Sequence, residues 1–254
     1  MNSLNSGYYE KYLVNRPSRV YKYQSFPHPK KYTENSIKNH YFWLSNPFDF
    51  NDPFDCYPSF IKGFESADEV KSYYHQFHNE EITIEIARTI YENPDLLDGE
   101  IKDNINGHGV CCFSRIPDSI LMWSHYSNYH KGICLGFDTS DDPAFNRLIN
   151  IQYLSSDFLN VKYSDPNEEA VFLAMIHKSA DWKYEEESRI ILDKPGELSY
   201  KKQSLKEVIF GAKMNTKDEQ LLMDLLLESG YKNVEFIKAK LSKRSFKLEF
   251  HKLN

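Results

Sequence analysis

One stretch, Asp181–Leu192, limits the fold of this chain more than any other part of the sequence. It places three consecutive glutamates and an arginine at the start of an aliphatic run, and such a run predicts a buried strand. Side chains alternate between the two faces of a strand, so Glu185, Glu187 and Arg189 should share one face. Two aromatic residues just before them would wall this polar group. It is either a structural ion-pair network or the floor of a functional site.

The chain has 254 residues, which is long enough to bury a large core as one domain. Its 31 Lys and Arg against 37 Asp and Glu give a net charge of −6. This charge argues against broad binding to nucleic acids or anionic membranes, but not against a local basic groove. Aromatic residues make up 15% of the chain, so we expect an interior filled with rings.

Several sequence features favour a cytoplasmic protein. The N-terminal residues lack the pattern of a secretory signal peptide, and no apolar run reaches the ~20 residues of a membrane-spanning helix. The four cysteines show no C-x-x-C spacing and no disulfide framework, so we expect small buried side chains in a reducing compartment. We therefore expect no association with a membrane.

Strand-like and helix-like segments occur in clusters rather than in regular alternation, which favours an α+β fold. We expect a single domain covering residues 1–254, with a helical block at 66–106 inserted between strands. Strands are predicted at 19–23, 40–45, 109–114, 131–138, 150–153, 161–163, 181–192, 206–211, 234–241 and 245–253. Helices outside the block are predicted at 34–39, 117–126, 168–179 and 216–229.

A turn-forming loop, Asn46–Asp55, follows the second predicted strand. Asn, Asp and Pro set its backbone and three phenylalanines anchor it, so the loop should be ordered. Two interpretations of its polar residues stay open. Asn51 and Asp52 either form a structural Asx-turn or face a pocket.

The segment Met122–Gly132 is the second unusual stretch, because it combines aromatic residues and two histidines at a predicted helix-to-strand junction. A histidine there can cap the helix or line a cleft. A metal centre built from His125, His130 and an acid such as Asp52 or Glu187 is weakly signalled, because a five-residue spacing does not stack two ligands on one helical face. We expect no metal. The sequence also lacks G-x-S-x-G, a phosphate-binding glycine loop and G-x-G-x-x-G.

Four groups of residues occur in a fixed order along the chain. They are Tyr21-Lys22-Tyr23; Leu44-Ser45-Asn46-Pro47 with Phe50-Asn51-Asp52-Pro53-Phe54; Met122-Trp123-Ser124-His125-Tyr126 with His130-Lys131-Gly132; and Trp182-x-Tyr184-Glu185-x-Glu187-x-Arg189. Together they resemble an uncharacterised bacterial family, the domain of unknown function 2971, from about residue 20 to about residue 212. That family implies no activity by itself.

A more distant resemblance is to the ADP-ribosyltransferase fold. Its three points are a basic residue on the first strand, an aromatic- or Ser-bearing second strand, and a late E-x-E. In this chain these are Lys22, Trp43 with Ser45, and Glu185-x-Glu187, with Lys22 standing where such enzymes usually carry Arg or His. The resemblance implies a split, mostly antiparallel β core and NAD as the substrate.

The same resemblance implies catalytic roles for Glu187, Glu185 and Lys22. Glu187 would stabilise the oxocarbenium-like transition state, Glu185 would position or deprotonate the acceptor, and Lys22 would hold the ribose or pyrophosphate. Replacing Glu187 with Gln should leave the fold intact and reduce turnover by about 10²–10³-fold. The remaining NAD-binding candidates are Arg19, Tyr23, Trp43, Ser45, Asn51, Asp52, Trp123, His125, Tyr126, His130 and Arg189.

Three functional hypotheses follow. The favoured one is an NAD-consuming, ADP-ribosyltransferase-like enzyme, a toxin or anti-phage effector that modifies a macromolecular acceptor, either protein or nucleic acid. The second is a non-catalytic module of a defence system that binds a nucleotide or peptide, in which the acids and Arg189 form only a satisfied ion-pair network. The third is a metal-dependent hydrolase or nuclease.

Overall fold

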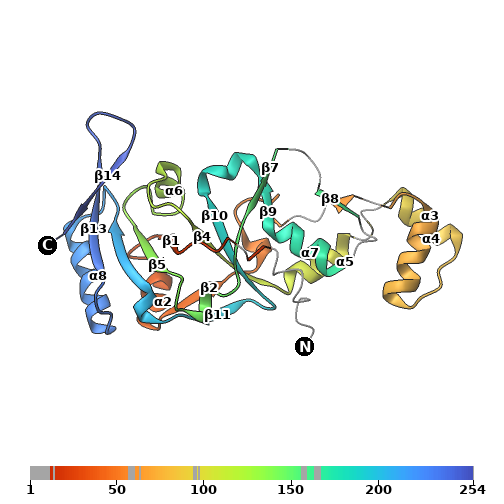
Figure 1. The fold of residues 1–254 in the computed structure, drawn as a ribbon, viewed down its shortest axis with the longest axis horizontal. Helices are drawn as coiled ribbons and strands as arrows, with labels where there is room; N and C mark the ends of the chain where they lie inside the picture. Colours follow the sequence, from red (N-terminus) through yellow and green to blue (C-terminus); the bar gives the residue numbers. More distant parts are fainter. Residues whose placement is uncertain are drawn as a thin grey trace.

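A large, mostly antiparallel sheet dominates the computed structural model, which describes residues 12–253 apart from 14, 57–60, 63, 94–95, 97, 156–158 and 163–166 (Figure 1). Only β12 and β13 run parallel within this eight-stranded sheet. The predicted α+β class with a mostly antiparallel sheet is therefore confirmed. In spatial order the strands are β14 (Leu248–Lys252), β13 (Glu235–Leu241), β12 (Leu205–Phe210), β5 (Ile133–Asp138), β1 (Arg19–Gln24), β4 (Gly109–Ser114), β10 (Glu187–Leu192) and β6 (Leu148–Asn150).

Three smaller strand pairs lie outside this sheet. The predicted second strand forms as β2, but it pairs with β11 rather than joining the main sheet. The pairs are β2 (Tyr41–Leu44) with β11 (Gly196–Ser199), β7 (Gln152–Leu154) with β9 (His177–Ser179), and β3 (Ile61–Lys62) with β8 (Leu159–Lys162).

The main sheet is divided between β1 and β4. β1 pairs with β5 along its whole length, but it meets β4 where Tyr21 lies opposite Ser114 and the two strands then separate. Beyond that point, a side-chain hydrogen bond links the two strands in place of backbone pairing: the Lys22 ammonium donates to the Cys112 carbonyl at 2.9 Å. The separation leaves room between the two halves of the sheet for side chains and for a cavity.

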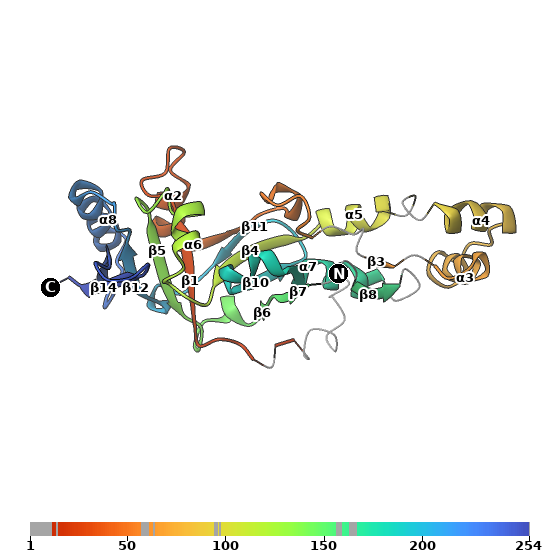
Figure 2. The same cartoon turned by 90° about the horizontal axis from the view of Figure 1, so that it is seen from above.

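Helices cover the sheet and extend the molecule at one end (Figure 2). α3, α4 and α5 occupy most of the predicted helical block, and α3 begins with the Ser66 hydroxyl accepting from the Glu69 N–H. α3 and α4 lie at the opposite end of the molecule from α8 (Figure 1). The helices are α2 (Tyr32–Lys38), α3 (Ala67–Tyr73), α4 (Ile84–Glu92), α5 (Asp98–Asn106), α6 (Ile120–His125), α7 (Asn167–Ile176) and α8 (Thr216–Glu228).

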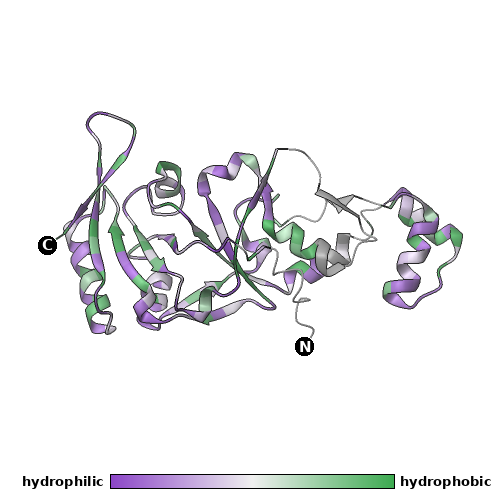
Figure 3. Cartoon of the chain, viewed as in Figure 1, coloured by the Kyte–Doolittle hydropathy of each residue, from purple (hydrophilic) through white to green (hydrophobic). Residues whose placement is uncertain are grey.

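The core is rich in aromatic rings, as the composition predicts. Phe42 lies at the centre of one cluster, with ring centroids of Phe113 and Phe137 both 5.0 Å from its own in edge-to-face contacts. A second cluster surrounds α7, whose segment 171–176 is buried throughout and is coloured as hydrophobic in Figure 3. Three of the four cysteines are buried and none is in a disulfide, in line with the prediction.

Candidate functional site

A cavity of about 220 Å³, the first cavity, opens where β1 and β4 separate. These strands supply two of its walls, and the loop after β2 and the residue that follows α6 contribute others. Its lining combines aromatic rings with both acidic and basic groups. The polar and charged lining residues include Lys22, Ser45, Asn51, Asp55, Ser114, Tyr126, Lys178, Glu185 and Glu187.

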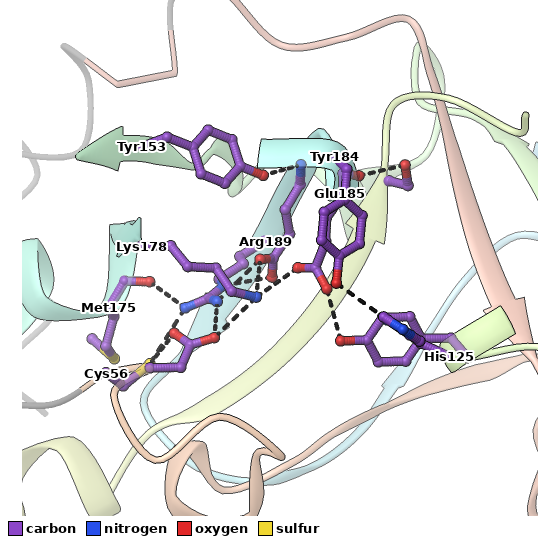
Figure 4. Close-up of polar contacts among 12 residues, drawn as sticks. Cys56, His125, Tyr153, Met175, Lys178, Tyr184, Glu185 and Arg189 are labelled. Carbon is purple, nitrogen blue, oxygen red and sulfur yellow. Dashed lines mark hydrogen bonds and ion pairs between the residues drawn. The ribbon is translucent and has the colours of Figure 1, made fainter. Parts of the chain in front are cut away.

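Four lining residues, Asp55, Lys178, Glu185 and Glu187, form a buried charge cluster together with Arg189, which lies behind them (Figure 4). Lys178 lies at its centre, because its Nζ is 2.6 Å from Glu185 Oε2, 3.0 Å from Glu187 Oε2 and 3.2 Å from Asp55 Oδ2. Three carboxylates face two cations, so the fully ionised cluster has one negative charge in excess. That excess lies beside the cavity, where a cationic group would be stabilised.

Arg189 holds the cluster from the protein side. Its Nε donates to Glu187 Oε1 at 2.6 Å and its Nη2 to Asp55 Oδ2 at 2.6 Å, while Nη1 donates to the Met175 carbonyl at 2.8 Å. The side chain is fully buried, so Arg189 does not reach the cavity. Its role in this arrangement is to orient Glu187 and Asp55.

The two glutamates differ in protonation behaviour. Burial acts to raise the pKa of Glu187, but Arg189 and Lys178 outweigh it and lower this pKa to about 2. Burial and the neighbouring charge of Glu187 raise the pKa of Glu185, although Lys178 and the Tyr126 hydroxyl oppose this. One carboxylate therefore stays ionised, and its neighbour binds a proton more readily. Pairs of this kind divide acid–base roles in enzyme active sites.

The structure corrects the prediction of a continuous strand over Asp181–Leu192. Ala180–Glu185 form a 3-10 turn that starts at Ser179, whose hydroxyl accepts from the Asp181 N–H. Glu186 then adopts a left-handed backbone (φ 45°), and β10 begins at Glu187. Glu185 consequently reaches the cluster from the turn rather than by strand alternation. The predicted proximity of Glu185, Glu187 and Arg189 holds, but for a different reason.

Lys22 and Tyr126 also line the first cavity, and Tyr126 contacts the cluster directly. The Tyr126 hydroxyl donates to Glu185 Oε1 at 2.7 Å, and burial together with Glu185 raises the pKa of Tyr126, so it remains a donor at neutral pH. Lys22 Nζ lies 5.2 Å from the Phe113 ring centroid and uses one N–H on the Cys112 carbonyl. A lysine ammonium has three donors, and the Cys111 side chain also lies within reach of this one.

Of the residues predicted to form a site, the structure brings eight to this cavity. Asn51 lines this cavity, so of the two alternatives for this residue the structure supports the pocket-facing one. The eight are Lys22, Tyr23, Trp43, Ser45, Asn51, Tyr126, Glu185 and Glu187.

Three other predicted residues lie elsewhere with partners of their own. Arg19 pairs with Glu207, with Nη1 and Oε1 3.2 Å apart. Asp52 accepts from the Phe54 N–H at 2.9 Å, which is the structural Asx-turn alternative. Trp123 is fully buried, and its indole N–H donates to the Pro117 carbonyl at 2.8 Å.

The two predicted histidines do not converge. His125 Nδ1 lies 3.2 Å from the Tyr184 hydroxyl, whereas His130 Nε2 lies 3.1 Å from Ser124 Oγ. In the part of the chain that the structure describes, no three His, Cys, Asp or Glu side chains are grouped as a metal site. The described residues therefore offer the metal-dependent alternative no group of ligands.

Sequence reasoning missed Lys178 and Asp55. Both had a signal in retrospect: Lys178 lies two residues after the apolar run of α7, where an unpaired buried lysine would be costly, and Asp55 ends the anchored loop Asn46–Asp55. The sequence does not show which residues these two side chains pair with. Asp55 and Arg189 are 134 residues apart and meet only in the folded chain.

A second cavity of about 490 Å³ adjoins the first, and the two share Lys22 and Trp43 as lining residues. It lies against β1, α2 and β2, and its walls are mainly aromatic and aliphatic. Gln24 also lines it, and the side-chain oxygen of Gln24 is buried without a hydrogen-bond partner among the described residues. Lys22 thus lines both a smaller cavity with acidic groups and a larger, mainly apolar one.

Comparison with known proteins gives one match. Residues 122–190 match the model of a family described as a protein of unknown function (DUF2971), which confirms the predicted resemblance over roughly a quarter of the chain. The matched segment runs from α6 to β10 and includes Tyr126, Lys178, Glu185 and Glu187. No curated protein and no solved structure matches the chain. None of the helices in the described part of the chain has the length and apolar character needed to cross a membrane.

Proposed function

We propose that this protein is an ADP-ribosyltransferase-like enzyme that cleaves the bond between nicotinamide and ribose in NAD. It would transfer the ADP-ribose to a macromolecule, as a toxin or an anti-phage effector does. One observation carries the proposal. Two adjacent carboxylates, Glu185 and Glu187, line a cavity with pKa values shifted in opposite directions, and Lys22 and Tyr126 line the same cavity.

The chemistry needs both kinds of carboxylate. When the bond between ribose C1′ and the nicotinamide nitrogen breaks, its electron pair leaves with nicotinamide and a cation develops on the ribose. The ionised Glu187, within a cluster of net negative charge, would stabilise that cation where water is largely excluded. The acceptor then bonds to C1′, and Glu185 would take the proton that the acceptor loses.

The two adjoining cavities suit a ligand with two ring-bearing halves. NAD has a nicotinamide riboside half and an adenosine half, joined by a pyrophosphate. The nicotinamide ribose would occupy the first cavity beside the glutamates, and the adenosine would occupy the second, whose volume of about 490 Å³ is within the usual range for ligand sites. Lys22, which lines both cavities, would then lie near the pyrophosphate.

A second candidate function has an observation in its favour. Both carboxylate oxygens of Glu187 already accept from Arg189 or Lys178, as expected for a satisfied structural network. In that case the protein is a non-catalytic module that binds a nucleotide.

Incubation of the purified chain with NAD, with protein, RNA and DNA as candidate acceptors, separates the two functions. Transferase activity predicts release of nicotinamide, and Glu185→Gln should slow that release by about 10²-fold or more if Glu185 takes the acceptor proton. Tyr126→Phe removes one hydrogen bond to Glu185, and Tyr129→Phe on the exposed surface is its matched control.

NAD binding without nicotinamide release would instead support the nucleotide-binding module. Failure to bind NAD would exclude the transferase and a module specific for NAD.

A further inference from the structure

The hairpin formed by β13 and β14 ends in a tip, Ser242–Lys247, that projects from the body of the molecule (Figure 1). Although the chain has a net charge of −6, residues 238–247 contain five Lys and Arg and no acid. Figure 3 shows this loop mostly in the hydrophilic colour. The tip is therefore a local basic region on an acidic protein.

The cations at the tip have no acidic partner. In the described residues, none of Lys243, Arg244 and Lys247 forms an ion pair, and all three are exposed. The lysines nearer the base of the hairpin differ, because Lys238 pairs with Glu219 and Lys252 pairs with Glu235. Unpaired positive charge thus increases toward the tip.

The turn itself is ordered by internal hydrogen bonds. The Ser242 N–H donates to the Lys247 carbonyl at 3.0 Å, the Lys247 N–H donates to the Ser245 carbonyl at 2.8 Å, and the Arg244 N–H donates to Ser242 Oγ at 3.3 Å. The backbone of such a turn is ordered before any partner binds, which reduces the entropy cost of binding.

Phe246 is the one apolar residue of the tip, and 98% of its surface is exposed. An aromatic ring in this position gains nothing from the folded chain, since it packs against no core. It lies next to Lys247 and two residues from Arg244. A flat ring flanked by cations can stack on a base while the cations contact phosphates.

We propose that the tip of the β13–β14 hairpin binds single-stranded nucleic acid, with Phe246 stacking on a base and Lys243, Arg244 and Lys247 contacting phosphates. An anionic membrane would also attract these cations. However, insertion into its interface normally uses several large apolar side chains on one face, and Ser242–Lys247 has only one. A single-stranded nucleic acid can engage both features of the tip, because its bases can stack on the ring and its phosphates can contact the cations. The inference does not depend on NAD chemistry, although it would supply an acceptor for it.

Fluorescence anisotropy with the full chain and a labelled single-stranded oligonucleotide of mixed sequence, without NAD, tests the proposal. We expect Lys243→Ala/Arg244→Ala to weaken binding about tenfold or more at low salt and to reduce the dependence of affinity on salt concentration. Phe246→Ala should weaken binding about fivefold or more, and Phe246→Trp should restore it because the indole ring also stacks. Lys217→Ala/Lys232→Ala, which removes two exposed lysines outside the tip, is the charge-matched control.

Three outcomes would overturn the proposal. The first is no binding of the oligonucleotide, and the second is equal binding by the parent chain and the tip variants. The third is binding of the parent chain to phosphatidylserine vesicles but not to the oligonucleotide, which would assign the tip to membranes. Because NAD is absent, none of these results bears on nicotinamide release.

Discussion

The buried charge cluster and the hairpin tip both concentrate charged side chains, but they differ in how those charges are satisfied. In the cluster, Lys178 and Arg189 are nearly inaccessible to solvent and meet three carboxylates at 2.6–3.2 Å. At the tip, the three exposed cations Lys243, Arg244 and Lys247 form no ion pair among the described residues. Buried charges have to be paired within the fold, whereas solvated charges need no partner there and remain available to bind another molecule. Removing one member of the cluster should therefore destabilise the fold, whereas removing the tip cations should not.

The largest expected effect is that of removing Arg189. An Arg189→Met variant leaves Glu187 and Asp55 buried with too little positive charge, so we expect the free energy of unfolding to fall by about 3–5 kcal/mol. Urea denaturation measures this change. Arg115→Met is the matched control, because Arg115 pairs with Glu186 nearer the surface and should cost about 1 kcal/mol or less. If the free energy of unfolding fell by a similar amount in both variants, the proposed difference between buried and solvated charges would be wrong.

A smaller effect is expected from acid. The folded-state pKa of Glu187, about 2, is below its ordinary value of 4.5, so the group favours the folded state at pH above 4.5. That contribution, about 3 kcal/mol, should be lost as the pH falls from about 5 toward 2. The raised pKa of Glu185 acts in the opposite sense and should offset part of the loss.

Urea denaturation at a series of pH values between 2 and 6, for the parent chain and Glu187→Gln, tests this assignment. The variant should be less stable at neutral pH, in contrast to the normal folding expected from sequence, because its amide cannot replace the charge that Arg189 and Lys178 face. Its stability should also change less with pH. An equally steep pH dependence in both proteins would assign the acid sensitivity to other groups.

The same contrast explains how much the sequence could predict. Local patterns sufficed for the strand at 109–114, which the structure reproduces residue for residue as β4, and for the last hairpin. They failed at Asp181–Glu185, where the capping hydroxyl of Ser179 and the left-handed Glu186 produce a turn. An aliphatic run fixes where a strand lies more firmly than where it begins.

The candidate site was predictable only in part, for a related reason. Glu185 and Glu187 stand out because they are neighbours in sequence, and Lys22 was selected by resemblance to a known fold. Lys178 and Asp55 were missed because their importance arises from pairing across distant segments, which only the folded chain specifies. Arg19 and Trp123 were selected by residue type, although Glu207 and Pro117 engage them outside the first cavity.

The smallest expected effect concerns the hairpin tip. Lys243→Ala/Arg244→Ala removes two exposed charges that no part of the described chain pairs with, so the free energy of unfolding should change by no more than about 0.5 kcal/mol. Urea denaturation beside Lys217→Ala/Lys232→Ala provides the comparison. A loss above about 1 kcal/mol would mean that the tip cations stabilise the fold itself, and the proposed contrast with the buried charge cluster would no longer hold. An unchanged stability leaves these cations, unlike Lys178 and Arg189, available for a partner outside the chain.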